Sequence, residues 1–572
     1  MFQPDLILLH APSVYDFRKK PILFGPVSDV IPSTQIFEMY PIGFMTLMGH
    51  LQRHGFSVRI INIALKMLRN QRFDVEKLIR KLSPRAFGID LHWMVHAHGS
   101  LALAEIIKKH HPDTPVIFGG LSSSYFHEDV IAYPQVDYVI RGNFAEEPLR
   151  QLMAAIKHGK SVEQIPGLTW KTNGTVQNTP LAPPPKDLNE LVLDYRTVMR
   201  STVRYMDFIG HVPFNEWPSY PIVLGHSCRG CTHNCVICGG SAFGCKQIGG
   251  HPAPVYRNPE QLAHDVGLSA RYINAPTFLL GDIMQAGEEY ALRFLDALQS
   301  EKFFNHLALE FFTPPPRHIL ERVAQVMPRF NIQMSPETHD QAIRKRCGRP
   351  YNNAALEQMM QDALDLGCQR FDLFFLIGLS EQTKQSVRDT ITYCRTLFER
   401  FGSGEHTGWF HPYISPLAPF LDPGSRGFEQ PEEFGYHILF RTVEEHRQAL
   451  AAPAWKYTLN YETDWMTRDD IAAITYEAAL AMNRLKYEFQ LQNEEDTRGR
   501  ETRILLERKA LQKIDEIFDI YPASEHPARV AAVMQQIETI GPHTLCHEHE
   551  MKWPMNPRRF NIVRILQGLL TP

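Results

Sequence analysis

Short apolar runs alternate with amphipathic stretches through the first 155 residues. The stretch from Pro41 to Gly55 repeats its apolar positions at helical spacing, and further helices are expected at 75–82 and 100–110. The apolar runs predict strands at 5–9, 56–63, 86–89, 115–118 and 136–140. Because strands and helices alternate, we expect a doubly wound parallel sheet of the flavodoxin or Rossmann type, which binds ligands beyond the carboxyl ends of its strands.

The same alternation returns after residue 221. Apolar runs there predict strands at 222–224, 277–280, 307–312, 332–334, 371–377 and 409–414. Six strand–helix units predict an open, partial (β/α)6 barrel. Beyond it, helical spacing predicts helices near 431–450, 468–490 and 502–518. We expect an α/β chain of four parts: a domain at 1–155, a linker at 156–220 with a hairpin turn at Asn173-Gly174, the barrel at 221–425 and a helical domain at 426–572.

Composition narrows the class of protein without identifying it. The 572 residues are too many for one core, and 44% hydrophobic with 21% charged residues is an ordinary globular composition. The formal net charge of −4 shows no basic excess, so no nucleic-acid partner is expected. No apolar run approaches the roughly 18 residues that cross a bilayer, so we predict a cytoplasmic protein without a membrane span.

The cysteines form a cluster that is typical of a metal site. Five of the nine fall between Cys228 and Cys245. Cys231, Cys235 and Cys238 have the spacing Cys-x3-Cys-x2-Cys, which can direct three thiolates to three irons of one cubane and leave the fourth iron open. Zinc held by Cys228 with the other three is the alternative, but two Cys-x2-Cys pairs on one short loop are cramped for a single ion. By default, Cys228 and Cys245 are packing residues.

These motifs resemble the cobalamin-binding radical SAM family. The cysteine loop resembles the family's cluster motif, although Ile237 stands where an aromatic residue is common. The segments Tyr40–Gly43, Val116–Gly120 and Val136–Gly142 resemble its cobalamin-binding domain. The resemblance implies three cofactors: a 4Fe-4S cluster, S-adenosylmethionine on its open iron, and cobalamin.

The resemblance implies cobalamin-binding residues at two strand ends of the first sheet. Gly119 and Gly120 let a ligand approach the backbone, and Ser122 and Ser123 are expected along the nucleotide tail of the corrinoid. The Asp-x-His-x-x-Gly signature of domains that ligate cobalt through histidine is absent. We therefore interpret His92 as a loop residue near the lower corrin face beside Trp93, with ligation of cobalt as the alternative.

The resemblance also implies residues that bind S-adenosylmethionine. They follow three of the predicted barrel strands: Gly281 and Asp282 come after 277–280, Ser335 and Glu337 after 332–334, and Gly378 and Glu381 after 371–377. The alternative for Glu337 and Glu381 is a loop carboxylate that caps a helix.

Reductive cleavage of S-adenosylmethionine is the activity that the resemblance implies, and methyl transfer to an unactivated carbon is the expected reaction. The alternatives are a radical cyclisation or rearrangement, and a noncatalytic, metal-stabilised corrinoid sensor. Expected partners are a small-molecule or peptide substrate and an electron donor such as flavodoxin or ferredoxin. No catalytic residue is assigned, and Cys546-His-Glu-His-Glu550 is interpreted as an exposed polar loop rather than a metal site.

Overall fold

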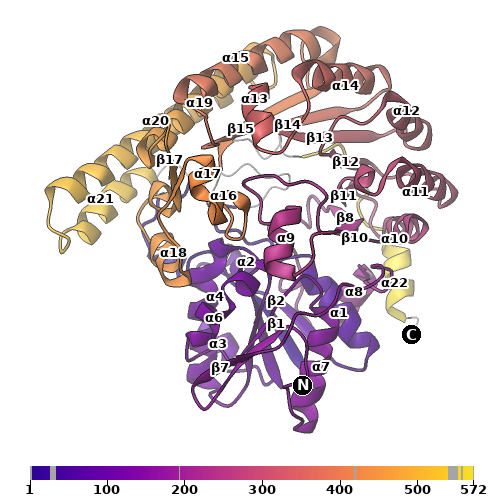
Figure 1. Cartoon of the computed structure of the whole chain (residues 1–572), viewed down its shortest axis with the longest axis vertical. Coiled ribbons are helices and arrows are strands. Elements are labelled where there is room, and N and C mark those ends of the chain that lie inside the picture. Colours follow the sequence, from indigo (N-terminus) through magenta and orange to yellow (C-terminus); the bar gives the residue numbers. More distant parts are fainter. Residues whose placement is uncertain are drawn as a thin grey trace.

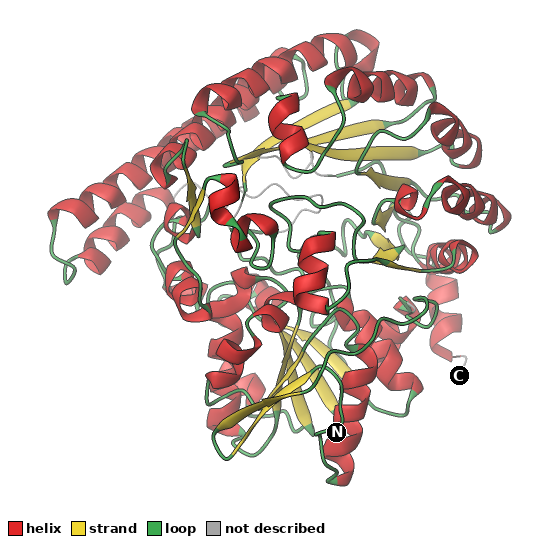
Figure 2. Cartoon of the chain, in the orientation of Figure 1, coloured by secondary structure: helices red, strands yellow, loops and turns green. Residues whose placement is uncertain are grey.

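The computed structural model describes residues 3–25, 34–191, 193–417, 420–538, 552–555 and 558–570. Two separate parallel sheets dominate it (Figures 1 and 2). In Figure 1 the first sheet and its helices lie at the bottom, the second sheet lies above, and helix α9 (Ala242–Gly249) lies between them. The α/β class and the division into two sheets therefore agree with the expected fold.

The first sheet has the strand order β2-β1-β3-β4-β5-β6-β7. Its five parallel strands are β1 (Leu6–His10), β2 (Val58–Asn62), β3 (Ala86–Asp90), β4 (Val116–Gly119) and β5 (Tyr138–Ile140). The helices between and after them are α1 (Gly43–Arg53), α2 (Ile63–Arg69), α3 (Val75–Ile79), α4 (Ala97–His110), α5 (Leu121–Tyr125), α6 (His127–Ala132) and α7 (Glu146–His158). The doubly wound sheet predicted from the sequence is confirmed. Because β1 and β3 are neighbours while β2 lies on the other side of β1, the topological switch point falls between β1 and β3.

The hairpin predicted at Asn173-Gly174 is confirmed and extends this sheet. Strands β6 (Leu168–Thr172) and β7 (Thr175–Asn178) pair antiparallel to each other, and β6 pairs antiparallel to β5. Part of the span that the sequence analysis treats as a linker therefore belongs to the first sheet. Helix α8 (Tyr195–Tyr205) follows before the barrel begins.

The second sheet contains all six predicted barrel strands. They are β8 (Val223–His226), β11 (Thr277–Leu280), β12 (Leu307–Phe311), β13 (Phe330–Glu337), β14 (Arg370–Ile377) and β15 (Phe410–Pro416), every pair parallel. Their helices are α10 (Pro259–Tyr272), α11 (Glu288–Ser300), α12 (Arg317–Val326), α13 (Gln341–Arg346), α14 (Asn353–Asp365) and α15 (Lys384–Phe401). The order β15-β14-β13-β12-β11-β8 runs from edge to edge, so the barrel is open as predicted.

Alternation along the barrel strands separates an outer core from an inner one. In β12, Leu307, Leu309 and Phe311 are buried against the surrounding helices. Ala308 belongs to a second cluster inside the barrel, and successive side chains point to opposite faces of a strand. Trp553 fills part of this interior: its backbone N–H donates to the Tyr220 hydroxyl at 2.6 Å.

The C-terminal region is mainly helical. It contains α16 (Arg426–Glu429), α17 (Pro431–Phe434), α18 (Val443–Leu450), α19 (Arg468–Glu488), α20 (Glu494–Ile520), α21 (His526–Glu538) and α22 (Ile562–Leu570). The helical stretches predicted near 468–490 and 502–518 are confirmed by α19 and α20. The stretch predicted near 431–450 is helical only in part, because strand β16 (Tyr436–Ile438) separates α17 from α18. The small antiparallel sheet of β16 and β17 (Tyr461–Thr463) was not predicted. The segment Cys546–Glu550 lies outside the described residues. Among the described helices, none is both long and apolar enough to span a bilayer.

Candidate functional site

A cavity of about 360 Å³ lies between the carboxyl edge of the first sheet and the loop that follows β8. On one side it is lined by Asp90, His92 and the loop at 119–121, and on the other by residues 226 and 228–230. Gly240 and Cys245, on the far side of the cysteine loop, line it as well. Residues that flank the cysteine motif therefore face the same cavity as the Gly119–Gly120 loop, whereas Cys231, Cys235 and Cys238 themselves do not line it.

The deep part of this cavity is an apolar slot beneath α1 and α7. Its wall consists of Leu8, Ile117 and Ile140 from the sheet and Phe44, Leu47 and Leu149 from the two helices. Gly88 also lines it, and a Cβ at this position would lie 2.7 Å from Cδ2 of Leu8. Apolar side chains thus form this slot, and the part of the cavity that Asp90, His92, Glu146 and Arg229 line is called its mouth.

The Gly119–Gly120 loop lies at that mouth. Gly120 has φ of +113°, and a Cβ there would be only 2.5 Å from the Cα of His92, so any other residue would clash. Ser122 and Ser123 are buried in α5 and do not line the cavity. The Ser123 hydroxyl instead donates to the carbonyl of Gly119 at 3.2 Å. The structure thus brings the two glycines, but not the two serines, to the predicted site.

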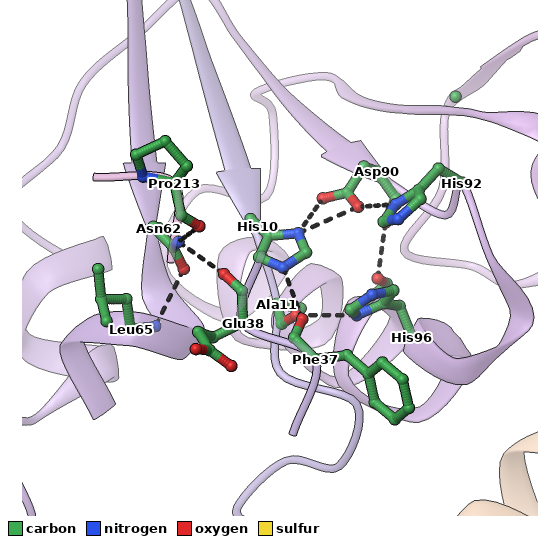
Figure 3. Close-up of polar contacts among 12 residues, drawn as sticks. His10, Ala11, Phe37, Glu38, Asn62, Leu65, Asp90, His92, His96 and Pro213 are labelled. Atoms are coloured by element: carbon green, nitrogen blue, oxygen red, sulfur yellow. Dashed lines mark hydrogen bonds and ion pairs between the residues drawn. The ribbon is translucent and has the colours of Figure 1, made fainter. Parts of the chain in front are cut away.

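The loop after β3 carries His92 and Trp93, and the two side chains have different surroundings. His92 faces the cavity, and its Nδ1 lies 2.6 Å from Oδ2 of Asp90 (Figure 3). The Trp93 Nε1–H donates at 3.2 Å to Asp422, whose other oxygen accepts from the backbone N–H of Gly239. Trp93 therefore links the first domain to the segment just after Cys238.

A buried ion pair joins the two domains at the same cavity. Arg229, in the short strand β9 (Cys228–Arg229) that pairs with β10 (Val255–Tyr256), donates from Nη1 at 2.8 Å to Oε2 of Glu146 at the start of α7. The Thr46 hydroxyl also donates to Glu146, at 2.7 Å. Although burial opposes ionisation, Arg229 and the hydrogen bonds lower the pKa of Glu146 to about 2. The carboxylate is therefore charged at neutral pH.

The cysteine loop brings three thiols together. Cys235 and Cys238 lie near enough to Cys231 for each to influence the ionisation of a neighbouring thiol, and burial raises the pKa of all three above the ordinary range. The loop rests on residues 347–348: the Val236 N–H donates to the Cys347 carbonyl at 3.0 Å. A Cβ at Gly348, where φ is +100°, would lie 2.9 Å from the Cα of Cys235.

Three thiols on one loop are the donor set that a cubane with one open iron requires. Among the residues that the structure describes, no three His, Cys, Asp or Glu side chains are placed to hold one metal ion. Tetrahedral zinc needs sulfurs about 2.3 Å from a common centre, whereas a cubane separates its three ligands by the cluster itself. Cys228 and Cys245 line the cavity instead, and the Cys245 thiol donates to the Gly240 carbonyl at 3.4 Å.

The two residues predicted after β11, Gly281 and Asp282, are both engaged in local packing and hydrogen bonds. Asp282 caps the 3₁₀ turn η3 (Ile283–Ala286), accepting from the backbone N–H groups of Met284 at 2.7 Å and Phe312 at 2.8 Å. Burial raises its pKa to about 6 despite these bonds. Gly281, with φ of +85°, packs against Ser227, where a Cβ would lie 2.7 Å from Oγ.

Strand β13 has a register irregularity near its carboxyl end. It falls between Met334 and Glu337, and Glu337 has φ of +67°. Its carboxylate is buried and accepts from Nε of Arg349 at 3.3 Å. Ser335 is partly exposed, and no described residue is a hydrogen-bond partner of its side chain.

The loop after β14 faces a different environment. Gly378 has φ of +99°, and a Cβ there would lie 2.1 Å from the Tyr461 hydroxyl of the C-terminal sheet. Glu381 has a side chain 40% exposed and pairs with Arg346 at 3.0 Å. Neither residue lines the cavity, so the structure does not bring this loop to the shared site.

Sequence reasoning missed Glu310 and Arg349. Glu310 is on the inner face of β12, alternating with the outward Leu309 and Phe311, and forms no side-chain hydrogen bond with a described residue. Burial raises its pKa to about 7, with Arg349 opposing and Asp282 adding to the rise. A single acid within the apolar run Leu307–Phe311 was the available signal. No signal in the sequence pointed to Arg349, because only the fold brings it to Glu337.

Comparisons with known proteins identify both halves of the site. The protein-family model of the B12 binding domain matches residues 33–152, and the protein-family model of the radical SAM superfamily matches residues 226–394. An uncharacterized methyltransferase of Pyrococcus horikoshii is 27% identical over 212 residues, which are 37% of this chain and 43% of the relative. An anaerobic magnesium-protoporphyrin IX monomethyl ester cyclase of Synechocystis is 22% identical over 247 residues, 43% of this chain and 45% of the relative. The matches thus span less than half of each relative.

Two solved structures share the fold. The radical S-adenosylmethionine methyltransferase TsrM of Kitasatospora setae, with cobalamin and a [4Fe-4S] cluster bound, has a TM-score of 0.56 and 14% identity over 95% of this chain and all of its own. The cobalamin-dependent S-adenosylmethionine radical enzyme OxsB has a TM-score of 0.57 and 12% identity over 99% of this chain and 78% of its own. At such identity the likeness shows the fold alone. The matched domains carry the predicted cofactors, cobalamin and S-adenosylmethionine with its 4Fe-4S cluster. With a B12 binding domain ahead of a radical SAM barrel, the chain belongs to the cobalamin-binding radical SAM family.

Proposed function

We propose that this protein is a methyltransferase that modifies an unactivated carbon of a substrate held between its two domains. The observation that supports this most is the cavity whose wall is shared by the Gly119–Gly120 loop and residues 226–230. Two cofactors that act on one substrate must both reach it, and one cavity between their domains meets that requirement. The names of the Pyrococcus relative and of TsrM point to the same reaction class.

In this proposal Cys231, Cys235 and Cys238 hold the cluster, and the apolar slot with Gly119 and Gly120 at its mouth receives the corrinoid tail. When bound, S-adenosylmethionine at the cluster supplies the one-electron chemistry that removes a hydrogen atom, and cobalamin supplies the methyl group. The protein orients the cofactors and the substrate and shields them from solvent. The ion pair of Arg229 with Glu146 fixes the two domains relative to each other across the cavity.

Inside the barrel, we propose that Gly281, Asp282, Ser335 and Glu337 contribute to the surroundings of S-adenosylmethionine. Asp282 does so by fixing the backbone after β11, since its oxygens are already used by two N–H groups. The Ser335 hydroxyl, near the end of β13, has no hydrogen-bond partner among the described residues, and the pair of Glu337 with Arg349 places a cation beside the cysteine loop. Flavodoxin or ferredoxin is the proposed electron donor.

The test uses anaerobically reconstituted, corrinoid-loaded protein with S-adenosylmethionine labelled in its methyl group. A methyltransferase transfers label to the corrinoid fraction and forms 5'-deoxyadenosine when substrate is present. Formation of 5'-deoxyadenosine without label in the corrinoid or in any product would favour cyclisation or rearrangement, the reaction class suggested by the cyclase relative. If protein with bound iron and bound corrinoid does not cleave S-adenosylmethionine at all, the noncatalytic corrinoid sensor is the remaining alternative. Cys235→Ala protein is the control for cleavage that does not depend on the cluster.

A further inference from the structure

Four histidines lie at the carboxyl edge of the first sheet, around the switch point between β1 and β3. They are His10, His92, His96 and His98. Their surroundings show which of the four imidazole rings has a nitrogen available to ligate a metal. A histidine that serves a metal needs one ring nitrogen held by the protein and the other open.

Three of the four rings are unsuited to this role. His10 is fully buried and uses both nitrogens, Nδ1 with Asp90 at 3.0 Å and Nε2 with the Phe37 carbonyl at 3.0 Å (Figure 3). His98 also uses both: its Nδ1 accepts from the Tyr15 N–H, and its Nε2 lies 2.8 Å from Nζ of Lys20. His96 is only 1% exposed and does not line the cavity.

His92 is arranged differently. Its Nδ1 is held 2.6 Å from Oδ2 of Asp90, its side chain is 29% exposed, and it lines the cavity beside Gly119 and Gly120. Its Nε2 makes no hydrogen bond with any residue that the structure describes. Of the four rings, this one has its outer nitrogen open at the mouth of the apolar slot.

The Asp90 carboxylate is itself fixed, because it is 4% exposed and also accepts from His10. A buried carboxylate that accepts the Nδ1–H of a histidine selects one tautomer, orients the ring and leaves the Nε2 lone pair available. The chain from His10 through Asp90 to His92 has this form. The close packing of Gly120 on the His92 backbone fixes the loop in place as well.

We propose that Nε2 of His92 is the lower axial ligand of the cobalt of bound cobalamin, with Asp90 and His10 as positioning residues. This replaces the interpretation of His92 as a loop residue, and it rests on the cobalamin site of the proposed function. The Asp-x-His-x-x-Gly signature is incomplete here, yet Asp90 and His92 make the contact between carboxylate and imidazole that its first half provides.

The test is electron paramagnetic resonance of the full-length protein loaded with cob(II)alamin, the cluster being kept oxidised and silent. One axial nitrogen splits each cobalt line into three when it is ¹⁴N and into two when it is ¹⁵N. Protein grown with ¹⁵N-histidine should give the twofold splitting, which distinguishes a histidine from the benzimidazole of the cofactor. His92→Gly should lose the splitting and regain it when imidazole is added. His98→Gln, a neighbouring ring with both nitrogens occupied, should keep it.

Three results would overturn the proposal. They are bound corrinoid without nitrogen splitting, a threefold splitting that persists in ¹⁵N-histidine protein, and an unchanged twofold splitting in His92→Gly. In each case absorbance still shows bound corrinoid, so the proposed function survives. If wild-type protein binds no corrinoid at all, the proposed function fails together with the ligand. Asp90→Asn should retain the nitrogen splitting with altered magnitude, as expected of a positioning residue.

Discussion

Removing the charge of Glu146 is expected to weaken the contact between the two domains. Its side chain is 6% exposed and its partner Arg229 is 14% exposed. The pKa of Glu146 falls from 4.5 to about 2 in the fold, and at about 1.4 kcal/mol per pKa unit this corresponds to roughly 3 kcal/mol. Loss of one partner of a buried pair typically costs about 3–5 kcal/mol, so the two values agree. Glu146→Gln should therefore lose about 3 kcal/mol at pH 7.

The dependence on pH has a definite sign. Because the pKa of Glu146 is lowered on folding, its contribution is complete well above pH 4.5 and is lost as the pH falls toward 2. For this pair of pKa values about 0.8 kcal/mol is lost by pH 4 and about 2 kcal/mol by pH 3. The difference between wild-type protein and Glu146→Gln should shrink accordingly.

Urea unfolding at pH 7 and pH 4 measures these differences, and hydrogen exchange locates them. Peptides covering the start of α7 and the strand β9 should exchange on the order of a hundredfold faster in Glu146→Gln. Glu147→Gln is the matched control: its carboxylate is 46% exposed and pairs with Arg150, so a change of about 0–1 kcal/mol is expected. Equal effects of the two substitutions, or a difference that is unchanged between pH 7 and pH 4, would refute the reasoning.

Three further predictions follow from the site. Cys235→Ala should lose most of the bound iron and the cleavage of S-adenosylmethionine, whereas Cys245→Ala should keep both, as iron analysis and product chromatography can show. Gly120→Leu should weaken corrinoid binding at least about tenfold in an absorbance titration, because its Cβ meets His92; Gly159→Leu, also at positive φ but in open space, should not. The raised pKa of Asp282, about 6 against 3.8, means that wild-type stability falls as the pH rises from 4 through 6. Asp282→Asn should reduce this pH-dependent loss of stability by about 3 kcal/mol. If urea unfolding shows the same dependence of the unfolding free energy on pH in wild type and Asp282→Asn, the prediction is contradicted.

Strand positions were predictable because buried parallel strands leave apolar runs in the sequence. All eleven predicted strands are present in the two sheets. The small sheet of β16 and β17 was missed because each strand has only three residues, too few for alternation to be recognised. Similarly, the placement of β6 and β7 beside β5 depends on long-range pairing, although their turn was visible as Asn173-Gly174.

The candidate site was predictable where one short segment carries its chemistry. The paired glycines at 119–120, which line the cavity, are of this kind, and so is the spacing of Cys231, Cys235 and Cys238, whose role as cluster ligands stays a prediction. Ser122 and Ser123 show the limit, because the turn into α5 directs them away from the cavity. Glu381 shows it again: the loop places its carboxylate beside Arg346, on the surface.

The sequence by itself determined the α/β class, the two alternating regions and the expected cofactors, and it predicts the cluster ligands, because periodicity and ligand spacing are local properties of the chain. Only the tertiary structure decided that the carboxyl edge of the first sheet and the loop after β8 share a cavity, and that Glu146 meets Arg229. It also decided that both nitrogens of His10 are used, while Nε2 of His92 has no partner among the described residues. These contacts join residues up to 83 positions apart. Such pairs are selected by the packing of whole elements, which no local pattern of apolar and polar residues records.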